Sequence, residues 1–392
     1  MKIGRWDLSI EDLSYAFMAF VLMGFHSVTI LLMLSQILCF GVQVLSMFKD
    51  YRTMRIPKHF LIYLCWFFIF LGYAGGSFLW SLCTKSHLSF VLSIIQAGMV
   101  SLSSILYVQD RKRFEKAVFF LTIGGLLLCL RMLVQVPFKV WGTERVGTYV
   151  GLGNVQVTYT LSYVAIFTFY EGLRKKNLFA IGSSFVMVLF SVLSGSKKAL
   201  IVAAVSIFLI VVFRNPDYRK ILIGLLVGTV LIVLMIFAVY KIPVLYTAIG
   251  KRFERMFAAL QGTGRDGSTA TRLRLIGYAW NTFKSYPILG VGLDAFRHLN
   301  PQGLYAHNNY LELLASLGIL GFLIYYSLPI GVLITAIYRC FKQHCSELIA
   351  AVAVMVSILA MDIASVSYMI EWIQLCMALC FAYLFINERS TL

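Results

Sequence analysis

Charged residues are scarce in this sequence, and their scarcity excludes a soluble protein. Only 13% of the 392 residues are charged, whereas 60% are hydrophobic. A soluble domain carries about a quarter charged residues. Several continuous apolar runs reach the roughly 20 residues that a helix needs to cross a bilayer. Because lipid supplies no hydrogen bonds to the backbone, each of these runs is expected to form a helix.

Patterns for metal binding and for disulfide pairing are also lacking. The six histidines are scattered, and no acidic motif accompanies them. Most of the eight cysteines lie inside apolar runs, without the spacing of a disulfide framework. Cys376 and Cys380 share one helix face at i, i+4, where packing is the simplest role for them. We therefore expect no metal and no cofactor.

A cleavable signal peptide is not expected. The first apolar stretch, residues 13–48, is too long for one, and no small-residue cleavage site follows it. At a rise of about 1.5 Å per residue, the stretch is also too long for one membrane crossing. It is expected to form two helices that meet near residues 24–29.

The hydrophobic pattern predicts an all-α, polytopic integral membrane protein with about twelve transmembrane helices. After the first pair, helices are expected at residues 59–81, 88–108, 117–136, 157–172, 178–193, 199–213, 221–240, 309–338, 348–366 and 370–386. The chain then has three parts. Residues 1–240 hold about nine membrane helices, residues 241–308 form a long extracytoplasmic basic loop, and residues 309–392 hold about three more membrane helices.

Lysine and arginine in the short loops indicate the orientation. Seventeen of them lie in one set of loops, around residues 49–58, 111–116, 174–176, 214–220 and 339–342 and at Arg389, whereas the alternate short loops hold five. The dense set is therefore expected to face the cytoplasm. Both termini then face the cytoplasm, and the protein is placed in the plasma (inner) membrane as a multi-pass protein.

The long loop, residues 241–308, is basic although it is expected outside. It carries nine lysines and arginines against three acids. Contact with anionic lipid head groups is one explanation, and an anionic substrate held at the outer surface is the other. The apolar spacing predicts a short interfacial helix at 253–260 and a second helix at about 271–284. Arg272 would then lie in the first turn of the second helix, where the helix dipole disfavours a cation.

Four features fall on the outer face under this topology. The first is the glycine-rich run from Arg145 to Asn154, which precedes a helix whose N-terminus would attract an anion. The second is Ser194-Gly-Ser-Lys197-Lys198, whose two lysines lie against the positive-inside preference and so favour phosphate binding over simple snorkelling. Both features are weak signals singly, because glycines also make plain turns.

The other two features follow in the long loop. Residues 286–296, Tyr-Pro-Ile-Leu-Gly-Val-Gly-Leu-Asp-Ala-Phe, are expected to form a turn. His307 stands where the loop meets a membrane helix, and histidine is the side chain best suited to pass a proton at neutral pH. A lone histidine is more often structural. Asp362 and Glu371, near the same face, are candidates because intramembrane acids are often functional, although pairing with a cation is the simpler role.

At these residues the chain resembles the O-antigen ligase and polysaccharide polymerase family of bacterial membrane enzymes. The resemblance covers about residues 145–325 and rests on the order and spacing of several motifs. These motifs are Arg145-x-Gly-Thr with Asn154, Ser-Gly-Ser-Lys-Lys, Arg272 before an aromatic-bearing helix, Pro287-x-Leu-Gly-x-Gly292, His307-Asn308-x-Tyr310-Leu, and Gly318 with Gly321. The family commonly has Ser-Arg-Gly where Ser196-Lys197-Lys198 stands, and lysine lacks the bidentate fork of arginine.

The resemblance implies a metal-independent glycosyltransferase that takes a glycan from an undecaprenyl pyrophosphate carrier and places it on a sugar hydroxyl. It implies His307 as the base, and Arg145 and Arg272 as the groups that hold the donor pyrophosphate. The residues expected to help in binding are Lys197, Lys198, Arg274, Asn154, Asn308 and Tyr310, and the reserve acids are Asp294, Asp362 and Glu371. The implied partners are the lipid bilayer, the donor, a glycan acceptor, a chain-length regulator and a flippase. Nucleic acid is not expected as a partner.

Two alternatives stay open at this stage. Within the family, the segments Asp294-Ala-Phe-Arg297 and His307-Asn-Asn-Tyr310 resemble capsule and exopolysaccharide polymerases more than ligases, but the residues do not decide between the two. Outside the family, a lipid-linked oligosaccharide flippase would also have a dozen helices and interior cations. A flippase would tend to have related halves, whereas this sequence has no internal repeat.

Overall fold

The computed structural model describes residues 2–3, 6–48, 57–141, 146–213, 218–261, 267–342 and 346–386. Each of the twelve predicted membrane helices has a counterpart in these residues. They are α1 (Ile10–Gly24), α2 (Thr29–Phe48), α3 (Lys58–Gly76), α4 (His87–Tyr107), α5 (Arg111–Gln135), α6 (Asn154–Lys175), α7 (Leu178–Leu193), α8 (Lys197–Phe213), α9 (Tyr218–Lys241), α14 (Asn309–Lys342), α15 (Ile349–Asp362) and α16 (Glu371–Ile386). The fold is all-helical apart from two paired two-residue strands, β1 (Lys2–Ile3) and β2 (Trp6–Asp7).

The connections contain short helices. These are η1 (Ser77–Trp80), η2 (Phe138–Val140), η3 (Val146–Val150), α10 (Pro243–Leu245), η4 (Tyr246–Gly250), α11 (Lys251–Leu260), α12 (Gly267–Ser285), α13 (Ala295–Leu299) and η5 (Ser346–Leu348). The two helices predicted in the long loop correspond to α11 and α12. The second of them begins earlier than the sequence indicated, so Arg272 lies in its second turn and not in its first, away from the helix end where the dipole acts most strongly.

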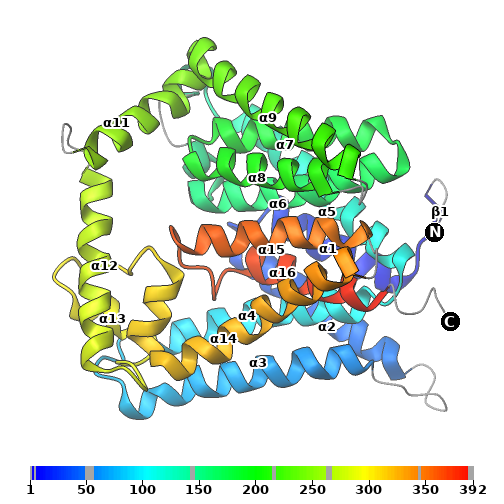
Figure 1. The fold of residues 1–392 in the computed structure, drawn as a ribbon. Coiled ribbons are helices and arrows are strands. Elements are labelled where there is room, and N and C mark those ends of the chain that lie inside the picture. The colour runs from blue at the N-terminus through cyan, green and yellow to red at the C-terminus, as the bar shows by residue number, and fades with distance from the viewer. Residues whose placement is uncertain are drawn as a thin grey trace.

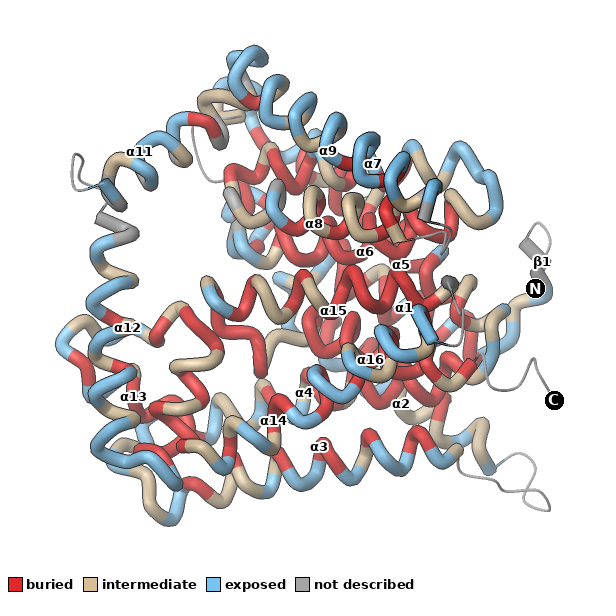
Figure 2. Tube along the Cα trace, in the orientation of Figure 1, coloured by how far each residue is buried: buried red, intermediate tan, exposed pale blue. Residues whose placement is uncertain are grey.

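Apolar side chains cover much of the outside of this bundle, as a membrane requires. Of the described helices, six are long and apolar enough to cross a bilayer, and four more are apolar but shorter. Helix α9 is the clearest case, because Leu226, Val233 and Phe237 are all more than half exposed on it. Figure 2 shows α3 and α9 with exposed residues along their outer sides, while α15 and α16 are largely buried. An exposed apolar surface of this extent needs lipid around it.

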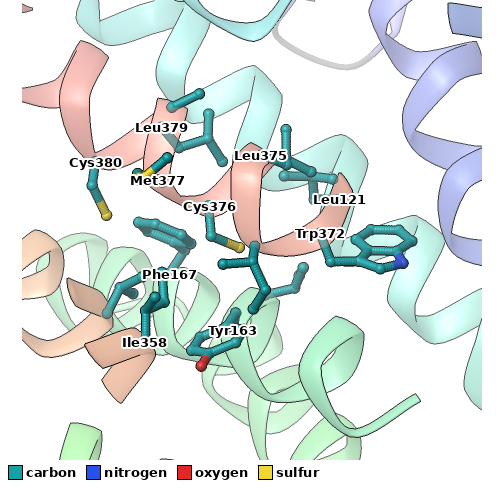
Figure 3. Packing of buried hydrophobic residues seen from close by; sticks show 14 of the residues in the cluster. Leu121, Tyr163, Phe167, Ile358, Trp372, Leu375, Cys376, Met377, Leu379 and Cys380 are labelled. Carbon is teal, nitrogen blue, oxygen red and sulfur yellow. The ribbon is translucent and has the colours of Figure 1, made fainter. Parts of the chain in front are cut away.

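Helix α16 is the centre of the hydrophobic core. Nearly all of its residues from Trp372 to Ile386 are buried. Figure 3 shows its side chains beside residues that come from three other helices, namely Leu121 of α5, Tyr163 and Phe167 of α6, and Ile358 of α15. Cys376 and Cys380 are buried among these apolar groups as free thiols, in accordance with a packing role.

The helix bundle has two ends, and one of them carries a cluster of ion pairs. Arg111 at the start of α5 contacts Glu171 near the end of α6 at 2.5 Å and Glu347 before α15 at 3.6 Å. Arg111 also donates to the Tyr383 hydroxyl near the end of α16. Lys116 pairs with Asp12 at the start of α1 at 2.6 Å. The start of α1 and the end of α16 therefore lie at this end of the bundle, whereas α12 and α13 lie at the opposite end (Figure 1).

Helix α14 is broken at Gly318, where the sequence predicted one continuous helix. Gly318 has φ 64° and ψ −170°, a backbone conformation that favours glycine. The break frees backbone groups that a continuous helix would pair, and residues 287–292 take them up. The four hydrogen bonds run from Val291 N to Ala315 O (3.0 Å), from Gly292 N to Ser316 O (2.8 Å), from Ile319 N to Pro287 O (2.9 Å) and from Leu320 N to Ile288 O (3.4 Å). The Pro-Ile-Leu-Gly-Val-Gly motif, expected to be a turn, thus also pairs with a broken helix.

Replacing Gly318 by alanine is expected to destabilise the protein by more than about 1 kcal/mol, because alanine does not tolerate the positive φ. Its Cβ would also lie 2.2 Å from the Ile288 carbonyl oxygen. Gly331, in the same helix, has open space where a Cβ would stand, so Gly331→Ala is the matched control. Thermal unfolding of the two variants in detergent measures the difference. Equal midpoints would contradict the proposed constraint at Gly318.

Candidate active site

Two cationic side chains and one histidine, all distant in the sequence, are grouped at the end of the bundle opposite the ion-pair cluster. Arg272 lies on α12, Lys198 lies in the first turn of α8, and His307 lies just before α14. The positive charges of Arg272 and Lys198 both lower the pKa of His307, so the three side chains act on one another electrostatically. The structure therefore brings together three of the residues that the sequence analysis expected to act on one substrate.

His307 is held in an unusual conformation. Its φ of 53° places it in the left-handed region, which costs a residue other than glycine of order 1–3 kcal/mol. The ring of Tyr305 packs on the imidazole with 4.4 Å between centroids. Within the part of the chain that the structure describes, neither imidazole nitrogen makes a hydrogen bond. The imidazole is thus oriented by its surroundings and keeps both nitrogens available.

Burial is the largest influence on the charge of His307, followed by the positive charges of Arg272 and Lys198. Together they lower its pKa from an ordinary 6.5 to about 4. The imidazole is therefore neutral at pH 7 and has a lone pair that can accept a proton. An anion bound between the two cations would cancel part of their effect and raise the pKa of His307.

Lys198 is fixed by the connection between α15 and α16. Its ammonium group donates to the carbonyl of Ala364 at 2.5 Å and to the hydroxyl of Tyr159 at 3.4 Å. The Tyr159 hydroxyl in turn hydrogen-bonds Ser365 in the same connection. Two of the three donor positions of the ammonium are thus directed by the protein, which sets the direction of the third.

Arg272 has a different environment. Its side chain is half-buried, and it forms no ion pair or hydrogen bond with any residue that the structure describes. A guanidinium offers five N–H donors in a fixed planar fork that matches phosphate oxygens. Because no described residue occupies these donors, Arg272 can offer them to an anion.

Asp362, one of the reserve acids, is the centre of a buried network. It is 2% exposed and accepts hydrogen bonds from Tyr326 (2.8 Å), Asn309 (3.3 Å) and Ser367 (2.5 Å). The Asn309 side chain also accepts from the backbone N–H groups of Ser367 and Tyr368. The network joins the start of α14, next to His307, to the connection that holds Lys198. Its geometry favours a positioning role for Asp362 over direct contact with substrate.

The side chains of Asn308 and Tyr310, expected to bind substrate, point into the protein. Asn308 donates to Ile363 O at 3.1 Å and accepts from Leu311 N at 3.0 Å, so it caps the start of α14. The Tyr310 hydroxyl donates to Leu359 O on α15 at 2.7 Å. Both side chains thus connect α14 to its neighbours, and the structure does not place them beside Arg272.

Four more predicted residues stand apart from the cluster or are only partly described. Arg274 is exposed, and among the described residues its guanidinium donates to the backbone of its own helix, at Ala270 O. Lys197 and Asn154 begin α8 and α6, and their side chains lie outside the described part of the structure. Arg145 lies outside the described residues, just before η3.

The remaining reserve acids are both paired. Glu371 forms an ion pair with His26 at 2.8 Å, which links the start of α16 to the connection between α1 and α2. Asp294 is fully buried, pairs with Arg297 at 2.7 Å and accepts a hydrogen bond from Ser86. Burial raises the pKa of Asp294, against the lowering effects of Ser86 and Arg297. The His26–Glu371 pair and the Ser86–Asp294 hydrogen bond each join segments that are distant in the sequence, whereas the Asp294–Arg297 pair lies within one segment.

Sequence reasoning missed several residues that shape this site. Tyr305, Tyr159 and Glu312 were not singled out, although Glu312 directly follows the motif His307-Asn308-x-Tyr310-Leu. Its position in the first turn of a helix, where an acid is favoured, was the available signal. Tyr305 and Tyr159 gave no local signal, because their importance comes from contacts with distant segments.

Two other features lie away from the cluster. An open apolar groove of about 710 Å³ runs between α3 and α14 and is lined by residues such as Leu61, Trp66 and Ile324. Its lining contains none of the candidate residues. Among the residues that the structure describes, no three His, Cys, Asp or Glu side chains are grouped so that they could hold a metal ion.

These observations define a helical multi-pass membrane protein with two cations and a neutral imidazole gathered at one end of its bundle. Residues 182–326 match the family model described as O-Antigen ligase. The chain thus resembles the O-antigen ligase and polysaccharide polymerase family of membrane enzymes, as the motifs indicated. The matched region runs from α7 into α14 and includes Lys198, Arg272 and His307. No curated protein matches the chain.

Proposed function

We propose that this protein is a membrane glycosyltransferase that uses undecaprenyl-pyrophosphate-linked oligosaccharide as its donor and extends a polysaccharide at the outer face of the plasma membrane. The observation that carries the proposal is the electrostatic grouping of three residues: Arg272, which pairs with no residue that the structure describes, Lys198, and His307 with its neutral imidazole. The first two supply positive charge for an anion, and the third supplies a proton acceptor. The family match agrees with this chemistry in its broad class.

In the proposed complex, the donor pyrophosphate lies between Arg272 and Lys198, with Arg145 as a third cation. A pyrophosphate diester carries two negative charges, and charge-assisted hydrogen bonds to its oxygens favour the charge that develops as it leaves. These cations take the part that a metal ion plays in many other transferases. Because the charge of the leaving group is stabilised in this way, a strong general acid is not required.

His307 acts on the acceptor. A sugar hydroxyl is a poor nucleophile, so its proton must be removed as it attacks. Its oxygen forms a bond to the anomeric carbon of the donor sugar while the bond from that carbon to the pyrophosphate oxygen breaks. The electron pair of the broken bond leaves with the pyrophosphate, and the hydroxyl proton passes to the imidazole. Donor binding prepares this step, because its negative charge raises the pKa of His307.

The proposal is tested by incubating the purified protein with an undecaprenyl-pyrophosphate-linked oligosaccharide. Transfer releases free undecaprenyl pyrophosphate. A polymerase gives longer lipid-linked glycans from the donor alone, whereas a ligase releases the carrier only when another envelope acceptor is added. If the protein moves the donor across a vesicle membrane without releasing the carrier, it is a flippase and the proposal is wrong.

The proposed orientation places both termini in the cytoplasm and the segment from 241 to 308 outside. In single-cysteine variants, Cys83 and a cysteine at the exposed Tyr286 are expected to react with an impermeant maleimide in intact cells. A cysteine at the exposed Lys112 is expected to react only after lysis. The reverse pattern would contradict both the orientation and a site on the outer face.

A further inference from the structure

Glu312 is a buried acid whose partners lie close to the candidate base. It is 1% exposed and stands in the first turn of α14, five residues after His307. One carboxylate oxygen accepts the backbone N–H of Ala306 at 2.7 Å, and the other accepts the hydroxyl of Ser316 at 3.2 Å. Ala306 is the residue directly before His307, and it is itself fully buried.

This hydrogen bond closes the chain back on itself around His307. The left-handed backbone of His307 is unfavourable for histidine and persists only where the surroundings impose it. On its far side, Asn308 is held by Ile363 and Leu311. On its near side, the N–H of Ala306 donates to Glu312, and the carbonyl of Leu304 accepts from the Asn300 side chain at 2.8 Å. The imidazole direction therefore depends on both attachments.

We infer that Glu312 is the positioning residue of this site: by accepting the Ala306 N–H, it sets the turn that points His307 at the acceptor hydroxyl. The inference rests on the proposed function of His307. Glu312 is not placed to contact substrate in this arrangement, because it is 1% exposed and its two oxygens face Ala306 and Ser316. Its effect reaches the reaction through the position of His307, while Arg272 and Lys198 stand on other helices and keep their places.

Two substitutions of similar size separate the hydrogen bond from the packing. Glu312→Gln keeps a carbonyl oxygen that can accept the Ala306 N–H, whereas Glu312→Met fills the space without a comparable acceptor. Misplacement of a catalytic group by about 1 Å costs about a hundredfold in rate. Glu312→Met is therefore expected to lower kcat by roughly ten- to a hundredfold, with the donor KM changed by less than about threefold. Glu312→Gln is expected to stay within about threefold of the wild type.

Ser316→Ala is the matched control. It removes the other hydrogen bond to the same carboxylate and leaves the bond to Ala306 in place, so it is expected to behave like the wild type. The measurement is steady-state release of undecaprenyl pyrophosphate by detergent-purified full-length protein. Absence of transfer by the wild type would defeat the proposed function. Normal transfer by the wild type, with no difference between the Met and Gln variants, would defeat the role of Glu312 alone.

Further results would also overturn the inference. Equal loss in the Gln and Met variants would mean that the charge matters and not the acceptor. A raised donor KM with unchanged kcat would mean that Glu312 supports the donor site. Failure of Glu312→Met and of Glu312→Ala to accumulate in the membrane, while Glu312→Gln accumulates, would make Glu312 a folding residue.

Discussion

Replacement of His307 by alanine is expected to lower the rate of glycan transfer by about a hundred- to ten-thousandfold, the usual contribution of a general base. Donor binding is expected to change little, because Arg272 and Lys198 remain. The measurements are carrier release under saturating donor and a separate titration of donor binding. A His307→Ala enzyme that turns over normally but binds donor weakly would make His307 a phosphate ligand, and it would pass the base role to a carboxylate.

The pH dependence of the transfer rate is a second test of His307. Because the pKa of His307 in the free protein is about 4, its neutral form persists as the pH falls from 7.5 to 5.5. An ordinary histidine with a pKa near 6.5 would be about nine-tenths protonated at pH 5.5. The acid limb of kcat/KM is therefore expected near pH 4, and that of kcat at higher pH, since kcat reports the donor complex. A kcat/KM limb at 6.5 would contradict the combined effect of burial and the two cations on His307.

The lowered pKa of His307 also makes the stability of the folded protein depend on pH. Below about pH 6.5 the unfolded chain takes up a proton at His307 that the folded protein does not take up until about pH 4. The contribution of His307 therefore favours the folded state above the unfolded pKa and is lost progressively between those two pH values. Burial is the first cause of the shift, and Arg272 and Lys198 are the next.

Replacement of Arg272 by alanine is expected to slow turnover by roughly ten- to a hundredfold or more. A charge-assisted hydrogen bond to a phosphate contributes about 1.5–3 kcal/mol, and no described residue pairs with Arg272 to be left without a partner. Expression and membrane insertion are expected to stay close to the wild type. Arg272→Lys keeps the charge without the planar fork, so an intermediate rate is expected.

Lys284→Ala is the control for this experiment. Lys284 is an exposed cation near the end of the same helix, so its loss removes one positive charge from α12 without touching the cluster. Carrier release and polymer yield in cells are the two measurements. If Arg272→Ala leaves both unchanged, Arg272 does not hold the donor. If Lys284→Ala slows turnover as much, the effect comes from the overall charge of the helix and not from Arg272.

The structure also separates the residues expected to bind substrate into two groups. Arg272, Lys198 and His307 meet, whereas Asn308, Tyr310 and Asp362 are engaged in contacts that hold α14, α15 and their connections. Their substitution is expected to act through the arrangement of the cluster. The roles of Arg145, Lys197 and Asn154 stay predictions, because their side chains are not described.

The helices themselves were determined by the sequence alone. Hydropathy is a local property, and lipid leaves an apolar segment no other way to satisfy its backbone, so each predicted membrane helix corresponds to an observed one. The breaks between them were also readable, as at residues 25–28, because one crossing has a limited length. The candidate cations and the histidine were also found from the sequence, through the order and spacing of short motifs.

Which of those residues meet was decided only by the tertiary structure. Arg272 and Lys198 act on the pKa of His307 although they stand on α12 and α8, far from it in the chain, and no periodicity in the sequence encodes that relation. Likewise, Gly318 reads as a helical residue until residues 287–292 lie beside it and take up the freed backbone groups. A hydrogen bond between segments depends on where both segments lie, whereas a helix depends mainly on its own residues. The break in α14 and the arrangement around the proposed base His307, with Glu312 beside it, depend on such placement of segments.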